Sequence, residues 1–169
     1  FEKLNLETDV TSAFALSENN PSIAAYIGQS NHNAGVAYLY DMKKKTSRLL
    51  ADPMKPILDE IELGKTEPWN FTASDGTTIQ GMMCLPPNFD PNKKYPLIVY
   101  YYGGTTPTER GIGNPYCAQL FASRDYVVYV INPSGTIGYG QEFSARHVNA
   151  WGKRTADDII EGTKQFCKE

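Results

Sequence analysis

The hydrophobic and polar positions of the chain follow two patterns, and the first covers residues 1 to about 52. Short runs of aromatic and branched residues alternate there with polar turn segments, which is typical of antiparallel strands. The four predicted strands span residues 12–16, 23–27, 36–40 and 47–50. Four strands in roughly 40 residues have the size of one propeller blade, a unit that needs neighbours to cover its faces. The pattern therefore predicts either a small independent meander or the last blade of a propeller.

A connector and a hairpin follow this segment. Residues 53–65 carry no strand pattern and are predicted to form a connector with one short helical turn. The next two predicted strands, 69–73 and 78–85, are joined at Asp75 and Gly76. Asp-Gly is a favoured two-residue hairpin turn because both positions tolerate positive φ. The sequence therefore predicts a β-hairpin directly after the connector.

From Tyr95 onward the pattern changes to alternating strands and helices. Residues 97–102 and 126–131 are continuous apolar runs, as expected for strands that are covered on both faces. A strand, a helix, a second strand and a second helix in this order predict a parallel sheet with covering helices. The predicted fold class is therefore α/β, preceded by a β-meander.

Two helices are predicted in this second part of the chain. The first is expected to begin at Asn114 and Pro115, with Asn as the cap and Pro at the first helical position. Its apolar stripe consists of Tyr116, Leu120 and Phe121. The second helix is expected to begin with Thr155 as its cap, and Asp157 and Asp158 in its first turn suit the helix dipole. Its predicted apolar face consists of Ala156, Ile159, Ile160, Thr163 and Phe166.

The composition is that of a globular protein, with 41% hydrophobic and 21% charged residues. The formal charge of −3 comes from acids and bases that are mixed along the chain. We therefore expect neither nucleic acid nor anionic lipid as a partner. No apolar run reaches the length needed to cross a membrane, and no signal peptide is recognised. The compartment stays open between the cytoplasm and the periplasm or extracellular space.

No metal ion or cofactor is predicted. The three cysteines, Cys84, Cys117 and Cys167, are odd in number and widely spaced, whereas a disulfide framework or a zinc site needs closer, paired cysteines. We interpret them as small hydrophobic residues of the core. The glycines within residues 135–140 match neither a Walker nor a dinucleotide-binding pattern, so a nucleotide cofactor is not expected.

Four motifs in a fixed order connect the second part of the chain with a known family. They are Ser-Asp-Gly-Thr-Thr-Ile-Gln-Gly at 74–81, Tyr-Gly-Gly-Thr at 102–105, Asn-Pro-Ser-Gly-Thr-Ile-Gly-Tyr-Gly at 132–140, and Trp-Gly at 151–152 followed by Asp157. With these motifs, residues 69–168 resemble the prolyl oligopeptidase family of serine peptidases, and within it the dipeptidyl peptidase IV and acylaminoacyl peptidase branches. Thr105 stands where the family usually has proline, and Ser134 stands where it has arginine. These departures bear on subfamily and substrate preference more than on fold.

The resemblance implies a β-propeller followed by an α/β-hydrolase domain. Residues 1–64 are then expected to be the last blade and connector, and residues 65–169 the first part of the hydrolase domain. In α/β-hydrolases the serine nucleophile sits on a strand-to-helix turn, and an aspartate and a histidine follow it. The chain contains no Gly-x-Ser-x-Gly, so all three are expected beyond Glu169. We therefore predict a fragment of a dipeptidyl or acylaminoacyl peptidase, a hydrolase of peptide bonds, that is inactive alone.

The residue with a predicted catalytic role in this chain is Tyr102. In the branch that the chain resembles, a tyrosine hydroxyl at this place helps to hold the developing oxyanion, which is typically worth ~10²–10³ in rate. The alternative is that Tyr102, like Tyr100 and Tyr101, is an ordinary aromatic residue of the strand. Gly103 and Gly104 form the predicted turn beside the oxyanion site and are interpreted as substrate-binding, because glycine allows positive φ and close backbone approach.

Other functions stay open on the sequence alone. His147 is not expected to be the catalytic base, because the triad histidine comes last in this fold, and a surface or packed histidine is predicted instead. An esterase of the same fold would use the same oxyanion geometry, and a non-catalytic interaction module could keep the scaffold. The partner expected for the whole protein is a peptide substrate. Because a lone blade and a half-built sheet leave unpaired edges, we also expect the fragment to self-associate through them.

Overall fold

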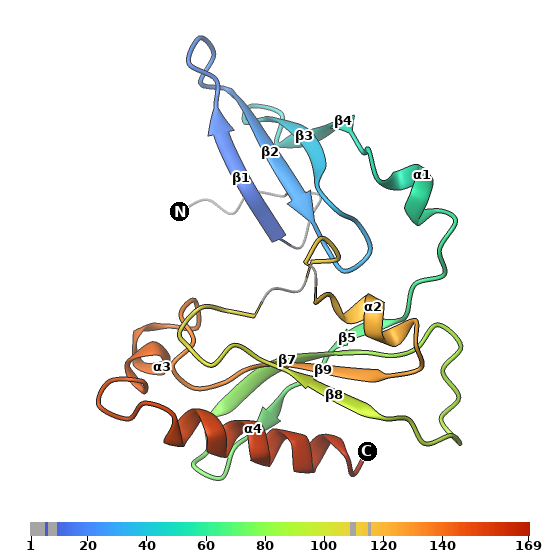
Figure 1. The fold of residues 1–169 in the computed structure, drawn as a ribbon. Helices are drawn as coiled ribbons and strands as arrows, with labels where there is room; N and C mark the ends of the chain where they lie inside the picture. The colour runs from blue at the N-terminus through green and yellow to red at the C-terminus, as the bar shows by residue number, and fades with distance from the viewer. Residues whose placement is uncertain (1–5, 7–9, 109–110, 115) are drawn as a thin grey trace. The chain divides into compact units, whose positions relative to one another are not determined.

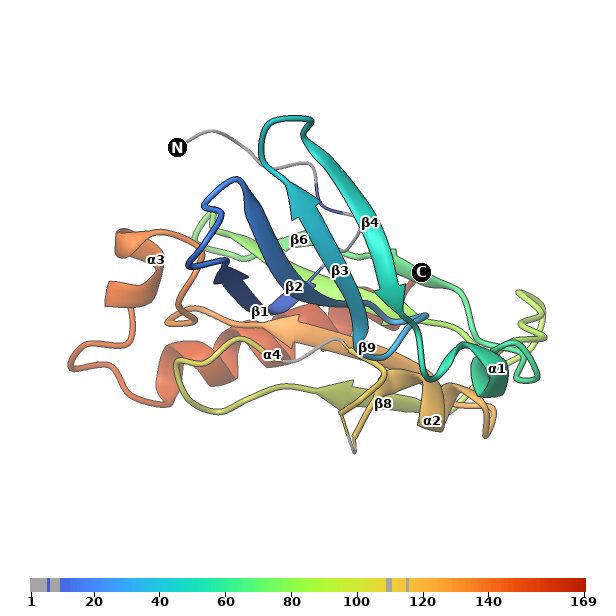
Figure 2. The ribbon, with the colours of Figure 1, turned by 90° about the horizontal axis from the view of Figure 1, so that it is seen from above.

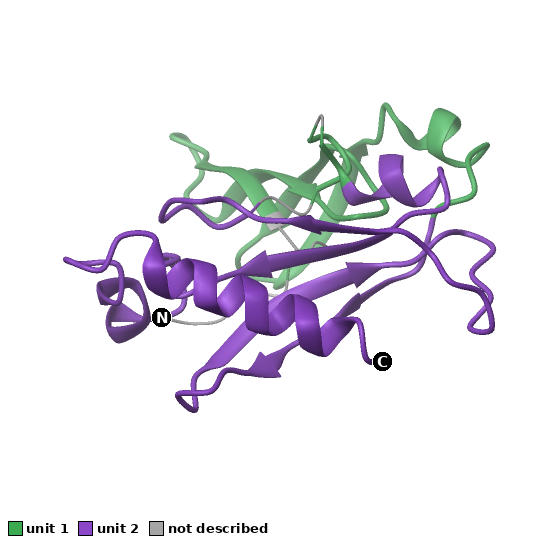
Figure 3. Cartoon of the chain, turned by 60° about the horizontal axis from the view of Figure 1, so that its bottom comes forward, with its two compact units in different colours: residues 1–63, 110–117 green, residues 64–109, 118–169 purple. Residues whose placement is uncertain are grey.

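The chain forms two compact units, which Figure 3 shows in different colours. The computed structural model describes residues 6, 10–108, 111–114 and 116–169. Unit 1 contains residues 1–63 and 110–117, and unit 2 contains residues 64–109 and 118–169. The chain thus leaves unit 2 after the predicted Tyr-Gly-Gly turn, returns briefly to unit 1, and then re-enters unit 2.

Unit 1 is a four-stranded antiparallel sheet (Figure 1). Its strands are β1 (Val10–Leu16), β2 (Ile23–Gln29), β3 (Val36–Asp41) and β4 (Thr46–Ala51), in the order β1-β2-β3-β4. Each strand pairs with its predecessor in the chain, so the polar segments between them are hairpin connections. The four strands predicted from the hydrophobic pattern are therefore confirmed. A short helix, α1 (Lys55–Leu58), follows in the connector.

The core of unit 1 is small and aromatic. Ala24, Tyr26 and Tyr40 are buried in one cluster, and the rings of Tyr26 and Tyr38 stack with their centroids 5.0 Å apart. Large apolar side chains nevertheless stay exposed on both edge strands: Phe14, Leu16, Leu49 and Leu50. Such a sheet has apolar surface left for a neighbour, and self-association through these edges stays a prediction.

Residues 111–114 contact the carboxyl end of β2. The Ile112 N–H donates a hydrogen bond to the Ser30 carbonyl over 3.1 Å. Gly111 lies against the side chain of Gln29, where an added Cβ would be 3.2 Å from Cδ. These contacts explain why this part of the chain belongs to unit 1.

Unit 2 is built on a mixed sheet with the strand order β5-β7-β9-β8. Its strands are β5 (Thr66–Pro68), β6 (Phe71–Thr72), β7 (Thr78–Cys84), β8 (Leu97–Tyr100) and β9 (Val127–Asn132), and β6 pairs with β7 beside the main path. The strands β8 and β9 run parallel, as predicted, whereas β7 runs antiparallel to β9. Because β8 and β9 are parallel neighbours, their carboxyl ends lie at the same edge of the sheet (Figure 2).

The predicted strand 69–73 is wrong in its extent. The structure has two shorter strands, β5 and β6, on either side of Trp69 and Asn70. The Asn70 side chain accepts a hydrogen bond from the Gly81 N–H over 3.1 Å, in place of a backbone acceptor. Side-chain acceptors of this kind compete with the strand ladder, and the alternation of residue types alone does not reveal them.

Helices cover both faces of the sheet in unit 2 (Figure 1). They are α2 (Ala118–Ala122), α3 (Gln141–Ala145) and α4 (Lys153–Phe166). The helix α2 packs on the face that carries Val128 and Val130, and α4 packs on the face that carries Tyr129 and Ile131. All positions of β9 are therefore buried, as a strand covered on both sides requires. None of the helices in the described part of the chain has the length and apolar character of a membrane span.

The predicted first helix starts too early. The helix in the structure, α2, begins at Ala118 rather than at Asn114. Pro115, the predicted first helical residue, lies outside the described residues. Tyr116 and Leu120 of the predicted apolar stripe are exposed, so the packing surface comes mainly from the small residues of α2 and from Phe121.

The predicted apolar face of the last helix is correct at Ile159 and Phe166, which pack against the core around Tyr129, and wrong at two other positions. The helix α4 begins at Lys153, with Gly152 as its cap residue, rather than with Thr155 as its cap. Its buried residues are Thr155, Asp158 and Gly162, whereas the predicted Ala156 and Ile160 are exposed. The helix therefore places Asp158, which was expected only to suit the dipole of the first turn, in the core of unit 2.

The three cysteines differ in burial. Cys84 is buried in β7, Cys117 is half-buried, and Cys167 is exposed after the end of α4. The interpretation of all three as core residues is therefore correct for Cys84 and wrong for Cys167.

Candidate functional site

The candidate site lies where β8 and β9 end. Residues 101–108 follow β8, and residues 133–140 follow β9. Tyr100 pairs with Val130 in the parallel ladder, so both loops leave the sheet at the same edge. In open α/β sheets ligands bind at the carboxyl ends of the strands, and this edge is therefore where catalytic groups are expected.

Tyr102 is the second residue after β8, and 53% of it is exposed. Its N–H donates a hydrogen bond to Thr108 Oγ1 over 3.1 Å. Its ring lies over Gly104, because a Cβ added to Gly104 would be only 2.7 Å from the ring carbon Cε1. The absence of a side chain at Gly104 thus allows the ring to lie against the turn.

The turn at Gly103 and Gly104 differs from the expectation in its backbone. Neither residue is among the glycines with positive φ, so the turn does not use the left-handed conformation that glycine allows. The small size of glycine is used at Gly104, where a Cβ would lie 2.7 Å from the Tyr102 ring. A Cβ added to Gly103 would meet no heavy atom within 4 Å, which leaves open space beside Tyr102.

Thr108 holds the loop after β8 against β9. It is 6% exposed, and its N–H donates a hydrogen bond to Asn132 Oδ1 over 2.8 Å. Its hydroxyl accepts the Tyr102 N–H and donates to the Ile131 carbonyl over 3.3 Å. The backbone at Tyr102 is thereby connected to the neighbouring strand through one buried side chain.

Asn132 is the last residue of β9, and it connects the two loops. Its side chain is buried, with its Oδ1 on the Thr108 N–H and its Nδ2 donating to the Tyr139 hydroxyl over 2.9 Å. A backbone hydrogen bond from the Ile137 N–H to the Thr105 carbonyl, 2.8 Å long, provides a second connection. The loops 101–108 and 133–140 are therefore joined at two places.

Two side chains of α4 hold the loop after β9 in place by hydrogen bonds. The buried Ser134 N–H donates to Asp158 Oδ2 over 2.8 Å, and the Thr155 hydroxyl donates to the Ser134 carbonyl over 3.3 Å. Gly135 has φ +99° and a Cβ there would lie 2.5 Å from His147 Nδ1, so both the conformation and the space require glycine.

Four charged side chains surround this anchor. Asp158 is fully buried and lies 3.3 Å from Arg154 Nη2, and Arg154 Nη2 lies 2.7 Å from Asp75 Oδ1. Arg146 Nη1 lies 2.8 Å from Asp75 Oδ2. The network links the hairpin turn, the end of α3 and the first turns of α4, and Asp158 is its buried end.

The network shifts two pKa values. Partial burial of the Asp75 carboxyl acts to raise its pKa, but hydrogen bonds from Arg146 and Thr77 and the charge of Arg154 outweigh burial and hold the pKa well below its usual range. Burial raises the pKa of the Tyr129 hydroxyl, and the nearby Asp158 raises it further. Asp75 is therefore a carboxylate at neutral pH, and Tyr129 is a neutral phenol.

His147 is buried beneath the loop after β9. Its ring meets the Trp151 ring edge-on, with the centroids 4.1 Å apart, and lies against Gly135. The prediction of a packed histidine rather than a catalytic base agrees with this position.

Sequence reasoning proposed Tyr102 and its two glycines, whose roles stay predictions, but it did not propose Thr108, Asn132 or Asp158 as residues of the site. The available signal for Asn132 was a polar side chain directly after a buried apolar run, at the carboxyl end of a predicted strand. Thr108 and Asp158 carry no such signal, because their partners are distant in the sequence: Ile131, Asn132 and Ser134.

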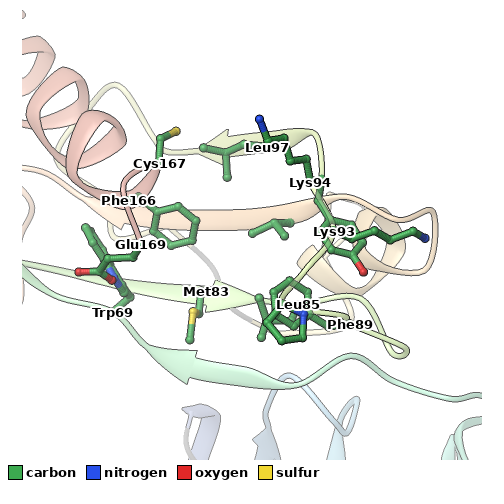
Figure 4. A pocket seen from close by; sticks show the side chains of 13 residues that line it. Trp69, Met83, Leu85, Phe89, Lys93, Lys94, Leu97, Phe166, Cys167 and Glu169 are labelled. Atoms are coloured by element: carbon green, nitrogen blue, oxygen red, sulfur yellow. The ribbon is translucent and has the colours of Figure 1, made fainter.

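An apolar groove of about 650 Å³ lies at the other end of the strands (Figure 4). Its lining includes Trp69, Phe89, Leu97 and Phe166 (Figure 4). Leu97 is the first residue of β8, so the groove is distinct from the loops that hold Tyr102. Within the described residues, no group of three or more potential metal ligands comes together.

Comparison with protein families supports the resemblance drawn from the motifs. Residues 115–169 match the family described as "Prolyl oligopeptidase family". The Dipeptidyl-peptidase 5 of Porphyromonas gingivalis is 28% identical over 133 residues, which are 78% of this chain and 19% of that protein. The Dipeptidyl-peptidase 5 of Aspergillus fumigatus is 35% identical over 85 residues, which are 50% of this chain and 12% of that protein. The chain therefore spans only a small part of these curated relatives.

A solved structure shows the same fold. The acylaminoacyl peptidase of Pyrococcus horikoshii superposes with a TM-score of 0.83 at 23% identity, over 99% of this chain and 26% of that chain. This likeness extends through both units, the antiparallel sheet and the mixed sheet with its helices. The α/β class predicted for the second part of the chain is confirmed.

Proposed function

From its resemblance to the prolyl oligopeptidase family, which the family match and the relatives confirm, we propose that this chain is a segment of a serine peptidase in which Tyr102 donates a hydrogen bond to the oxyanion. The observation that carries the proposal is the position of Tyr102 at the carboxyl end of a parallel strand. Its side chain is half-exposed there, its N–H is held by Thr108, and its ring lies against Gly104.

The two units take the places that the family order suggests. Residues 1–64 are the end of a propeller, and the exposed apolar side chains Leu49 and Leu50 on the edge strand β4 would face further structure. Residues 65–169 are the first part of an α/β-hydrolase domain. The printed sequence contains no Gly-x-Ser-x-Gly, so the nucleophile, its base and its acid would come from other parts of the protein.

The chemistry of this segment is electrostatic. When a serine attacks a peptide carbonyl, negative charge develops on the carbonyl oxygen, and a donor fixed at that place stabilises the transition state more than the ground state. A phenol hydroxyl can donate such a hydrogen bond to the developing oxyanion. Gly103 and Gly104 leave room for the substrate backbone to approach the hydroxyl of Tyr102.

The proposed substrates are peptides, from whose amino terminus the whole protein would release dipeptides. The support is the similarity to proteins named Dipeptidyl-peptidase 5. An esterase would use the same oxyanion geometry, and the comparison of an aminoacyl anilide with the matching ester substrate would distinguish the two.

The test is Tyr102→Phe in the full-length protein, with Tyr101→Phe as the matched control. Tyr101 is the preceding residue and is also half-exposed. Loss of one oxyanion donor is expected to lower kcat on a chromogenic dipeptidyl substrate by about 10²–10³-fold with little change in KM, whereas Tyr101→Phe should stay within about twofold. A Tyr102→Phe variant that keeps wild-type kcat would overturn the proposal.

A further inference from the structure

We infer that Thr108 is a positioning residue for Tyr102, and that Asn132 holds Thr108 in place from the neighbouring strand. The inference rests on the proposed function of Tyr102. Two buried polar side chains, Thr108 and Asn132, then hold the oxyanion donor in place. They also connect it with the loop of residues 133–140.

The first step is that the backbone of Tyr102 needs a residue that holds it in place. The strand β8 ends at Tyr100, so the backbone of Tyr102 has no ladder partner to fix it. The hydrogen bond from the Tyr102 N–H to Thr108 Oγ1, 3.1 Å long, takes that place. A donor on a loop must be held close to its productive geometry, because a displacement of about 1 Å can cost about 10²-fold in rate.

The second step is the chemistry of the threonine. A hydroxyl can accept one hydrogen bond and donate another, and Thr108 does both, since it accepts from Tyr102 and donates to the Ile131 carbonyl over 3.3 Å. The donation to a β9 carbonyl fixes the orientation of the oxygen, so its lone pairs face the Tyr102 N–H. Valine has the same shape without the oxygen, whereas serine keeps the oxygen without the methyl group.

The third step is the side chain that fixes Thr108 itself. Asn132 is 1% exposed, and its Oδ1 accepts the Thr108 N–H over 2.8 Å. Its Nδ2 donates to the half-buried Tyr139 hydroxyl over 2.9 Å. An amide is suited to this position because it accepts on one side and donates on the other. The position of Tyr102 therefore depends on residues of both loops.

The test compares Thr108→Val with Thr108→Ser in the full-length protein, on the same dipeptidyl substrate. We expect Thr108→Val to lower kcat by about 10–100-fold with KM within about twofold, and Thr108→Ser to stay within about threefold of wild type. Wild-type kcat in Thr108→Val, or a loss in Thr108→Ser as large as that in Thr108→Val, would show that the effect does not come from the oxygen and would overturn the inference.

A double-mutant cycle separates this inference from the proposed function. If Thr108 acts through Tyr102, then Thr108→Val should cause no further loss of kcat in a Tyr102→Phe background. A full additional loss in that background would overturn the positioning role while leaving the oxyanion role intact. A Tyr102→Phe variant with wild-type kcat would instead overturn the proposed function.

A milder variant keeps the inference testable if Thr108→Val does not fold. Tyr139→Phe removes the partner of Asn132 Nδ2 at a half-buried position. We expect a loss of kcat of about 3–10-fold, absent in the Tyr102→Phe background. Wild-type kcat in Tyr139→Phe, or the same loss in both backgrounds, would contradict the connection through Asn132.

Discussion

Removal of the buried carboxylate at the base of the candidate site gives the sharpest prediction about stability. Asp158 is 0% exposed, accepts the buried Ser134 N–H over 2.8 Å, and lies 3.3 Å from Arg154. In Asp158→Ala the Ser134 N–H loses its acceptor, whereas Arg154 keeps Asp75 as a partner. Removing one member of a buried pair costs about 3–5 kcal/mol. Because Arg154 retains Asp75, we expect the lower end, about 3 kcal/mol.

The variant Asp158→Asn separates the contribution of the charge to this loss of stability from that of the hydrogen bond. The amide oxygen can still accept the Ser134 N–H, so only the charge is removed. A hydrogen bond to a charged group is worth about 1.5–3 kcal/mol and a neutral one about 1 kcal/mol. We therefore expect Asp158→Asn to lose about 1–2 kcal/mol, clearly less than Asp158→Ala.

The matched control is the neighbouring residue. Asp157 pairs with Lys153 at 2.9 Å, and its side chain is 39% exposed. Exposed pairs of this kind contribute little, so Asp157→Ala is expected to change the free energy of unfolding by less than about 0.5 kcal/mol. The two variants differ by one position along α4, so intrinsic helix propensity does not distinguish them.

The assay is denaturant unfolding followed by tryptophan fluorescence. Both tryptophans of the chain, Trp69 and Trp151, belong to unit 2, and Trp69 meets the rings of Tyr129 and Phe166 edge-on at 5.0 and 4.9 Å. The signal therefore reports the core that Asp158 borders. Equal free energies of unfolding for Asp158→Ala and Asp157→Ala would refute the assignment of Asp158 as the buried anchor.

Two further predictions concern the same unit. The folded pKa of Asp75 lies below its ordinary value of 3.8, so its contribution to stability is present above that pH and is lost as pH falls below it. In thermal unfolding, Asp75→Asn should lower the Tm at pH 7 and flatten the fall of Tm below about pH 4. A variant whose Tm falls with pH in parallel with that of the wild type would contradict this. A Cβ at Gly162 would lie 2.6 Å from the Phe71 ring, so Gly162→Ala should lose about 1–3 kcal/mol by denaturant unfolding despite the gain in helix propensity. A stabilised variant would refute the close packing of α4.

Much of the fold was predictable because its signals are local. Alternating and continuous apolar runs depend on residues a few positions apart, and they located all four strands of unit 1 as well as β8 and β9. The motif around Tyr102 was predictable for the same reason. The strand and turn residues of this motif follow one another in the sequence, so they were recognisable without knowledge of the tertiary structure.

The errors occurred where a side chain bonds to a distant part of the chain. The strand 69–73 is interrupted by Asn70, whose partner is the Gly81 N–H. Thr108 and Asn132 are polar residues of ordinary type, and only the parallel pairing of β8 with β9 brings them within hydrogen-bond distance.

The sequence by itself determined the four strands of unit 1, the strands β8 and β9, the α/β character of the second part, and the resemblance that points to Tyr102. Only the tertiary structure decided which of two adjacent aspartates is buried. The rotation of α4 about its axis is set by its packing on Tyr129 and Ile131 of β9, and that packing places Asp158 inside and leaves Asp157 at the surface. Neighbouring residues of a helix point about 100° apart around its axis. An error of one residue in the assignment of the buried face therefore exchanges the predicted positions of Asp157 and Asp158.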